Sequence, residues 1–513
     1  MGQMTRRKFV QLGAQGIALA TIPGFLRFNP SAAFARPSGE PGELSDYYAH
    51  FGVDEAVIRE VMAAALAKGG DYCDVYFQHT ISTDVVLEDD VVGRAYTSVD
   101  LGVGIRVLEG DQTGYSFTEE ITPKSMKLAA QTAANIAANG GASAPTGLRF
   151  GPTPNFYPVQ TGWEEVSVDK RIPIMQAVNE KMAALDNRLV KRRVYYGDSA
   201  SYVLVATSDG RAVCDYRPLT YMYGICTAEI DGRRETSQYS VSARKGMEYY
   251  TDELLDRVAG NAVRDTLRMF DAVKPEAGEM PVVLGAGDSG ILLHEAIGHG
   301  MEADCNRKNE SIYADRIGKP IAENIVSILD DGTVPYWRGS LNVDDEANEI
   351  QKTVLVEDGV LKTYMHDLIS SKFYGVAPTG NGRRQSFRHN PMPRMRNTYM
   401  LNGPHTKEEI IRSVKKGLYC ESFTNGEVRI GPGDFTFYVK CGNLIEDGKL
   451  TAPVKDVNII GNGPKVLEKI TMVADDFALS ELTWGCGKGG QSVPVSLGQP
   501  TVLVSSITVG GVG

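Results

Sequence analysis

Two histidines and an acid stand close together in the segment HEAIGHGMEAD. His294 and His299 are five residues apart, and Glu295 directly follows the first. Metallopeptidases commonly place two histidines four residues apart on one helix, so that both imidazoles bind one zinc ion. On a regular α-helix, residues five apart differ by about 140° around the axis, too much to share a metal. A π-type turn brings them back onto one face. We therefore predict a zinc site on a helix distorted at Gly298, where glycine tolerates the distortion.

The alternative for this pair is two separate histidines, each hydrogen-bonded in its own surroundings. The neighbouring sequence argues against it, because VVLGAGDSG is typical of a buried strand and turn, and ILLHEAIGHG then begins a helix with an apolar face. A catalytic zinc also needs a third protein ligand. Glu302, Asp304 and Cys305 are nearby candidates. Cys486 is the better candidate, in a distant glycine-rich loop whose backbone amides can hydrogen-bond a thiolate, although composition alone favours an ordinary cysteine there.

Two other polar motifs are candidates for binding. PTGNGRR (378–384) offers backbone amides and two cations to a substrate backbone or carboxylate; the alternative is a tight turn whose arginines are solvated or form salt bridges. The acidic segment DDEANE (344–349) is weakly indicative of calcium, and a solvated loop is the favoured interpretation. HNPMPRMRNTYM is interpreted as structural.

The elements that must position these residues form an α+β pattern. Before residue 275, amphipathic helices alternate with strand segments, and residues 190–242 form a run of strands with hairpin turns. The polar segment KPEAGEM, with proline and glycine, predicts a domain boundary. Glycine-punctuated strands follow, with hairpins at LVEDGVLKTY and LIEDGKLTAPV. We predict a mixed α/β amino-terminal domain (36–275) and a mainly antiparallel β carboxyl-terminal domain (280–513) that carries the zinc helix.

The composition restricts the class of protein. The chain has 513 residues, enough for two or three domains, and its 42% hydrophobic and 23% charged content is ordinary for a globular protein. Its net charge of −11 argues against a nucleic-acid partner, because phosphate binding needs a basic surface. Seven cysteines are too few for a disulfide framework, and the odd number leaves at least one sulfur free, metal-bound or paired with another chain.

The first 35 residues have the pattern of an export signal. Arg6 and Arg7 precede Phe9, a mildly apolar run follows, and Ala-Phe-Ala at 33–35 matches a cleavage site. The paired arginines resemble a twin-arginine signal, whose route carries folded proteins. The alternative is a membrane anchor, but glycines and a proline make the run a poor spanning helix. We predict a signal peptide over 1–35, export to the periplasm or extracellular space, and no stable membrane insertion after signal removal.

The motifs together carry a family resemblance. HEAIGHGMEADCNRK, PTGNGRR, PMPRMRNTYM and GCGKGGQSVPVSLGQPT fall in the order and spacing of the TldD branch of the TldD/PmbA (TldD/TldE) metallopeptidase family. The sequence closely resembles that family over essentially the whole mature chain, less so before residue 280. The resemblance implies that His294, His299 and Cys486 bind Zn²⁺ and that Glu295 acts in catalysis. It also places the 378–384 segment near the active site, which gives four candidate substrate-binding residues: Asn381, Gly382, Arg383 and Arg384.

The resemblance implies a zinc-dependent metallopeptidase that hydrolyses unfolded or small peptides, with a zinc-activated water and Glu295 as general base. It also implies a homodimer, or a heterodimer with a homologous TldE/PmbA-like chain. Familiar members are cytoplasmic, so the export signal departs from the family and leaves the natural substrate and partner open. The alternative is a non-catalytic regulatory or assembly partner with a structural zinc, since the family has also been called a modulator of DNA gyrase. Glu295 argues against it, because a scaffold needs no general base.

Overall fold

The computed structural model describes residues 43–136 and 143–511 of the chain. The predicted signal peptide lies outside the described residues. The described residues form one compact unit, and the division between residues 275 and 280 stays a prediction. The fold is α+β, as predicted. No described helix combines the length and the apolar character that a membrane crossing requires.

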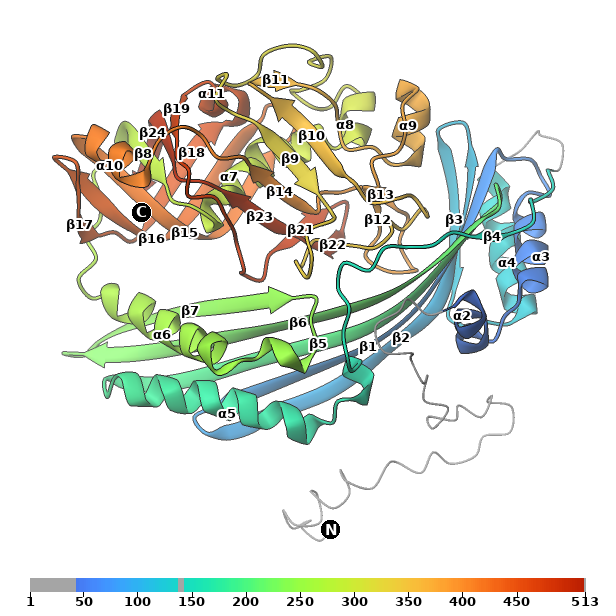
Figure 1. The fold of residues 1–513 in the computed structure, drawn as a ribbon, viewed down its shortest axis with the longest axis horizontal. Coiled ribbons are helices and arrows are strands. Elements are labelled where there is room, and N and C mark those ends of the chain that lie inside the picture. The colour runs from blue at the N-terminus through green and yellow to red at the C-terminus, as the bar shows by residue number, and fades with distance from the viewer. Residues whose placement is uncertain (1–42, 137–142, 512–513) are drawn as a thin grey trace, which may run out of the picture. The chain divides into compact units, whose positions relative to one another are not determined.

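A long antiparallel sheet dominates the first half of the chain (Figure 1). Its neighbouring strands are β3 (Gln112–Thr118), β2 (Val91–Glu109), β1 (Tyr72–Glu88), β5 (Leu189–Thr207), β6 (Arg211–Ile230) and β7 (Arg233–Ala243). Short β4 (Arg149–Phe150) adds to β6 in parallel. Along much of β6, fully buried residues alternate with partly buried ones. Since successive side chains of a strand point to opposite faces, the sheet has one closely packed face and one more open face.

Helices cover the packed face as two groups. One group is α2 (Leu44–Phe51), α3 (Glu55–Ala65) and α4 (Pro123–Ala133), which share a core with β1, β2 and β5. The other is α5 (Val168–Leu185) and α6 (Asp252–Arg268), which share a core with β5 and β6. Helices α3, α4 and α6 begin where the side chains of Asp54, Thr122 and Thr251 accept backbone N–H bonds.

A second sheet forms in the carboxyl-terminal half. Its strands are β15 (Lys416–Arg429), β8 (Gly278–Leu284), β24 (Val502–Gly511), β18 (Val457–Asn462), β16 (Asp434–Glu446) and β17 (Lys449–Pro453), with β19 (Ile470–Val473) beside β24. Strand β15 also pairs with β16, so five of these strands close on themselves. The hairpin predicted at LIEDGKLTAPV is β16–β17.

A third sheet and two short ladders complete this half. The sheet runs β11 (Val360–Leu361), β10 (Lys352–Glu357), β9 (Ile328–Asp331), β14 (Asn397–Met400), β23 (Ser496–Gln499) and β20 (Ala478–Leu479). The ladders are β12 (Gly382–Arg383) with β13 (Met392–Pro393), and β21 (Gly485–Lys488) with β22 (Gln491–Pro494). Most strand pairs of this half are antiparallel, as predicted. The remaining short helices are α8 (Ala303–Arg307), α9 (Leu368–Tyr374), α10 (Lys407–Ser413) and α11 (Gly463–Leu467).

The acidic segment 344–349 is mostly buried, so the predicted solvated loop is wrong. Asp345 and Glu346 are at most 1% exposed. The carboxylate of Asp345 lies 2.6 Å from the guanidinium of Arg217 on β6, and that of Glu346 lies 2.7 Å from Arg106 on β2. A buried carboxylate is stable when a cation compensates it. These acids therefore join the first sheet to the carboxyl-terminal half and do not form a metal cluster among the described residues.

Candidate metal centre

The helix that carries the two histidines changes its winding at the site. It consists of three consecutive pieces: α7 (Ile291–Leu293), a π-helical turn (His294–Gly298) and a 3₁₀ turn (His299–Met301). The amide of His299 donates to the carbonyl of His294, the i+5 to i bond of a π-turn. The predicted distortion is therefore confirmed. A Cβ atom on Gly298 would lie only 1.9 Å from Sδ of Met395, so glycine is needed here for space as well.

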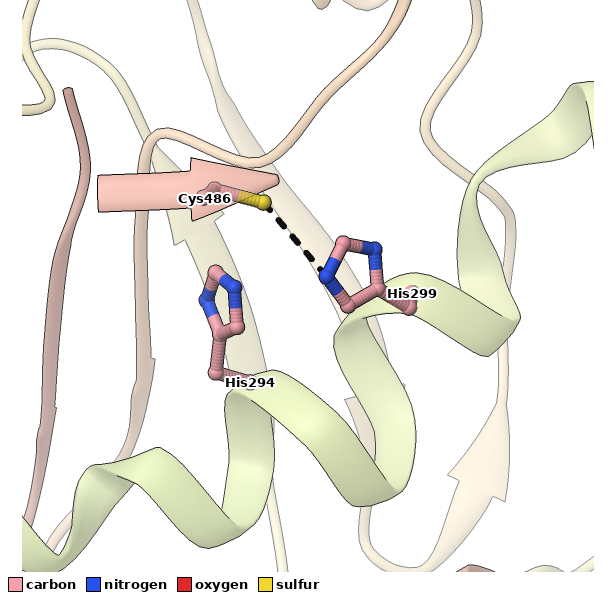
Figure 2. A group of neighbouring side chains, drawn as sticks. All are labelled: His294, His299 and Cys486. Atoms are coloured by element: carbon pink, nitrogen blue, oxygen red, sulfur yellow. Dashed lines mark hydrogen bonds between the residues drawn. The ribbon is translucent and has the colours of Figure 1, made fainter. Parts of the chain in front are cut away.

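The distortion turns both imidazoles toward a cysteine from a distant strand. Figure 2 shows His294 and His299 on the helix, facing Cys486 on β21. All three side chains are buried, and their potential ligand atoms lie within 4.8 Å of one another. The imidazole rings are nearly perpendicular, at 84°, with centroids 5.0 Å apart. The structure thus brings together the three residues predicted as metal ligands.

The geometry of this cluster fits a zinc ion. Zinc–sulfur and zinc–nitrogen bonds in a tetrahedral site leave sulfur and nitrogen about 3.6 Å apart, and Sγ of Cys486 lies 3.5 Å from Nε2 of His299. Nδ1 of His294 is buried without a hydrogen-bond partner among the described residues. Two imidazoles and one thiolate are a donor set that suits zinc.

The neighbouring histidines favour the thiolate form of Cys486. Burial alone raises the pKa of the Cys486 thiol, but the neighbouring His294 and His299 outweigh burial and bring that pKa well below its usual value. Burial lowers the pKa of His299, but Glu302 and Cys486 outweigh it, and the net pKa is well above its usual value. The cysteine is therefore held as a thiolate, the form that binds metals.

Glu302 supports His299 from behind. One oxygen of its carboxylate lies 2.9 Å from Nδ1 of His299, three residues away, and the carboxylate is fully buried. Nζ of Lys488 lies 3.0 Å from the same oxygen. Burial raises the pKa of Glu302, but Lys488 and His299 outweigh it, so the net pKa falls and the carboxylate stays charged. A carboxylate on the far nitrogen of a metal-binding histidine fixes its tautomer and orientation.

Glu302 is therefore not part of the cluster of potential metal ligands, although the sequence made it a candidate. It contacts Nδ1 of His299, on the side of the ring away from Cys486, together with Lys488 and Arg394. Asp304, another candidate, lies 2.6 Å from Nζ of Lys488, and Cys305 is not part of the cluster. The spacing of three residues between His299 and Glu302 on a helical turn is the signal that sequence reasoning missed.

Arg394 fixes the strand that carries the cysteine. Its side chain is fully buried, and Nη2 donates to the carbonyl of Cys486 at 2.5 Å. Its Nε lies 3.6 Å from the carboxylate of Glu302. One guanidinium thus connects the strand of Cys486 to the carboxylate behind His299. This contact agrees with the structural interpretation of PMPRMRNTYM.

Glu295 lies beside both histidines and is 8% exposed. Burial raises the pKa of its carboxyl, while His294 and His299 act in the opposite direction, and the net pKa is raised. A Cβ atom on Gly426 of β15 would come within 3.0 Å of Cγ of Glu295, so this strand covers the side chain closely. A carboxyl group with a raised pKa beside potential metal ligands is suited to proton transfer.

The four candidate substrate-binding residues, Asn381, Gly382, Arg383 and Arg384, are all buried. The three that have polar side chains are between 0 and 4% exposed. Asn381 donates to Asp330 at 2.8 Å. Arg383 donates to the carbonyls of Met395 and Pro494, and Arg384 to the carboxylate of Asp74. These contacts within the chain favour the structural alternative for the loop. A role of these residues in substrate binding stays a prediction.

Replacing Glu302 by glutamine is expected to weaken zinc binding about 10- to 100-fold, the usual effect of losing a supporting partner. Glutamine keeps the shape of the side chain but removes the charge that orients His299. The dissociation constant is measured by competition with a chromogenic chelator. Asp304→Asn is the matched control, because Asp304 pairs with Lys488 but does not touch a histidine. Unchanged zinc affinity in Glu302→Gln would contradict the assigned role.

Three domain models of one protein family match the chain in consecutive order. They are the PmbA/TldA metallopeptidase domain 1 over residues 73–137, the central domain over 162–270 and the C-terminal domain over 277–511. The last of these contains the histidine turn and Cys486.

Known proteins agree with the family models. A metalloprotease TldD homolog of Haemophilus influenzae is 39% identical over 448 residues, 86% of this chain and 93% of that protein. A zinc metalloprotease TldD homolog of Saccharolobus solfataricus is 29% identical over 452 residues, 86% of this chain and 97% of that protein. The crystal structure of TldE from Thermococcus kodakarensis has the same fold, with a TM-score of 0.69 and 19% identity over 89% of this chain and 99% of that one. The chain belongs to the PmbA/TldA family of metallopeptidases, also called TldD/PmbA.

Proposed function

We propose that this protein is a zinc-dependent peptidase that hydrolyses unfolded or small peptides. The observation that carries the proposal is the convergence of His294, His299 and Cys486 on one buried point, with Glu295 beside it. A relative that carries the name zinc metalloprotease supports the choice of metal, and others named metalloprotease support the reaction. The cluster of three potential ligands supports catalysis over a purely structural metal, because structural zinc sites use four protein ligands.

Each residue of the site has a role in this proposal. His294, His299 and Cys486 hold the ion, and Glu302 keeps His299 in the orientation that binds. When bound, zinc supplies Lewis acidity to a water molecule and to the scissile carbonyl. The carboxylate of Glu295 accepts the proton of the attacking water and returns it to the nitrogen of the leaving amine. Burial of the cluster keeps bulk water away and strengthens these electrostatic interactions.

The proposal also covers the partner and the location of the protein. We propose a dimer, formed with a second copy or with a homologous TldE/PmbA-like chain, and the fold shared with TldE supports it. We propose export by the twin-arginine-type signal to the periplasm or the extracellular space. This is supported by the paired arginines, the apolar run and the Ala-Phe-Ala sequence of residues 1–35.

Removing the metal is the experiment that tests the proposed function. Purified mature protein is expected to hydrolyse an unstructured reporter peptide, to lose at least about 100-fold in rate after dialysis against a chelator, and to recover with one equivalent of zinc. The same measurement with a co-purified homologous partner covers a heterodimeric enzyme. Bound zinc without turnover in either sample would favour the regulatory or assembly partner with a structural zinc.

A further inference from the structure

A cavity of about 520 Å³ opens on the less packed face of the first sheet. Tyr195 of β5 and Tyr221 and Tyr223 of β6 line it on one side. Arg338 and Gly485 line it on the other, and Gly485 directly precedes the metal-site residue Cys486. The cavity therefore extends to the strand that presents the metal-site thiol.

A smaller cavity of about 130 Å³ adjoins the first. The two cavities share Tyr223, Gln238 and Thr483 in their linings. The smaller one also reaches Phe423 and Thr424 of β15. The same strand covers Glu295 shortly after these residues, through Gly426. The two cavities thus run beside β15 and β21, the strands that carry Gly426 and Cys486.

Arg338 contributes an uncompensated positive charge to this cavity. Its Nε donates to the carbonyl of Trp484 and its Nη1 to Oγ of Ser242, both at 2.8 Å. Among the described residues, Nη2 makes no hydrogen bond and no carboxylate lies within 4.0 Å of the guanidinium. Burial lowers the pKa of Arg338 to about 10, so the side chain is still a cation at neutral pH. A partly buried cation without an anion is unfavourable until one binds.

The other arginine of the cavity provides a contrast. Arg193 lies 2.6 Å from the carboxylate of Glu88, so its charge is already compensated within the chain. The guanidinium of Arg338 instead has two fixed hydrogen bonds that orient it and one nitrogen left to bind. A planar guanidinium held in this way is suited to a carboxylate.

The tyrosines form an aromatic wall opposite this charge. The rings of Tyr195 and Tyr221 stack with an interplanar angle of 11°, and Tyr223 meets both edge-on. The hydroxyls of Tyr195 and Tyr221 donate to the carboxylate of Asp84 at 3.0 and 2.7 Å. These hydrogen bonds fix the two rings and give both hydroxyls and the carboxylate of Asp84 a partner within the chain. Fixed aromatic rings offer a large surface for a side chain at little entropic cost.

We propose that Arg338 binds a carboxylate of the peptide substrate, while the tyrosine wall contacts the residue beside it. The inference rests on the proposed function in one respect, that the ligand of the cavity is the substrate of the metal centre. The carboxylate is either the carboxyl terminus of the peptide or an acidic side chain, since both present the same two oxygens to a guanidinium. Arg338 is thus a specificity-determining residue for a peptide with a negative charge at one fixed position.

Peptide binding without turnover tests this proposal. The background is Glu295→Gln protein, so that peptides are not consumed, and affinity is read by fluorescence anisotropy of amino-terminally labelled peptides. One peptide pair differs in a free or amidated carboxyl terminus, and a second, amidated pair differs in an internal Glu or Gln. Affinity is expected to differ about 10- to 100-fold within one pair, the effect of a charge-assisted hydrogen bond. The pair that responds identifies the source of the carboxylate.

Variants of the two arginines assign the preference to its residue. Adding Arg338→Gln is expected to reduce the ratio of affinities to about one, and Arg338→Lys to retain part of it. Arg193→Gln is the matched control and keeps the ratio, because Glu88 compensates Arg193 and retains Lys191 at 2.6 Å. A thermal unfolding curve verifies that each variant is folded. If Arg338→Gln does not fold, the proposal is still tested in two ways. The peptide pairs are measured with Arg338 intact, and Arg338→Lys is compared with that protein.

The binding assay separates this inference from the proposed function. Equal affinity of both members in both pairs, with Arg338 intact, would overturn the inference even if the wild-type enzyme cleaves peptides. A carboxylate preference that depends on Arg338 supports the inference even if no peptide is cleaved. In that second case the cavity binds peptides through a carboxylate, and only the peptidase proposal fails.

Discussion

Replacing Glu295 by glutamine is expected to lower the rate of peptide hydrolysis about 10²- to 10⁴-fold, the usual contribution of a general base. Glutamine has nearly the same shape as glutamate but cannot accept a proton from water. Because Glu295 is not one of the three clustered ligands, the zinc content is expected to stay at the wild-type level. The measurement is kcat and KM on a reporter peptide, with metal content determined on the same samples by mass spectrometry.

An exposed glutamate provides the control for this variant. Glu310 lies shortly after the metal-site helix and is exposed, so Glu310→Gln removes the same charge without touching the cluster. It is expected to hydrolyse the peptide at the wild-type rate. Equal activity of wild type and Glu295→Gln at equal zinc content would show that another group takes the proton. Loss of zinc from Glu295→Gln would instead mean that the carboxylate contributes to the metal site.

The local part of the site could be predicted from the sequence because it depends on helix geometry. A separation of five positions between His294 and His299 is incompatible with one metal on a regular helix, so a shared metal requires a π-turn. Gly298, the last residue of that turn, leaves the space that Met395 fills. The same reasoning extends to hairpins, whose turn residues are local signals. These predictions needed no knowledge of the rest of the chain.

Contacts between distant residues could not be predicted in this way. Cys486 is 187 positions from His299, and only the family resemblance selected it over Cys305. The acidic segment 344–349 has the composition of a solvated loop, and it is buried because arginines from β2 and β6 compensate it. Arg338 gave no sequence signal, since its lack of a carboxylate partner is a property of the folded surroundings.

Replacing Cys486 by alanine is expected to remove zinc from the purified protein and with it the peptidase activity. The variant leaves two imidazoles, and the loss of a direct ligand should exceed the roughly 10- to 100-fold expected for a supporting residue. Cobalt(II) substitution gives a direct readout, because a thiolate bound to cobalt has a charge-transfer absorption band in the near ultraviolet. Wild-type protein loaded with cobalt is expected to show this band, and Cys486→Ala to lack it.

Cys305→Ala is the matched control for the cysteine ligand. Cys305 is also buried and follows the histidine turn closely, but it is not part of the cluster, and burial raises the pKa of its thiol to about 12. A thiol with a raised pKa is a poor ligand, so Cys305→Ala should retain zinc, activity and the cobalt band. If the band persisted in Cys486→Ala and disappeared in Cys305→Ala, the ligand assignment would be wrong. The two variants differ in which sulfur they remove, so this comparison separates loss of the ligand from a general effect of removing a buried thiol.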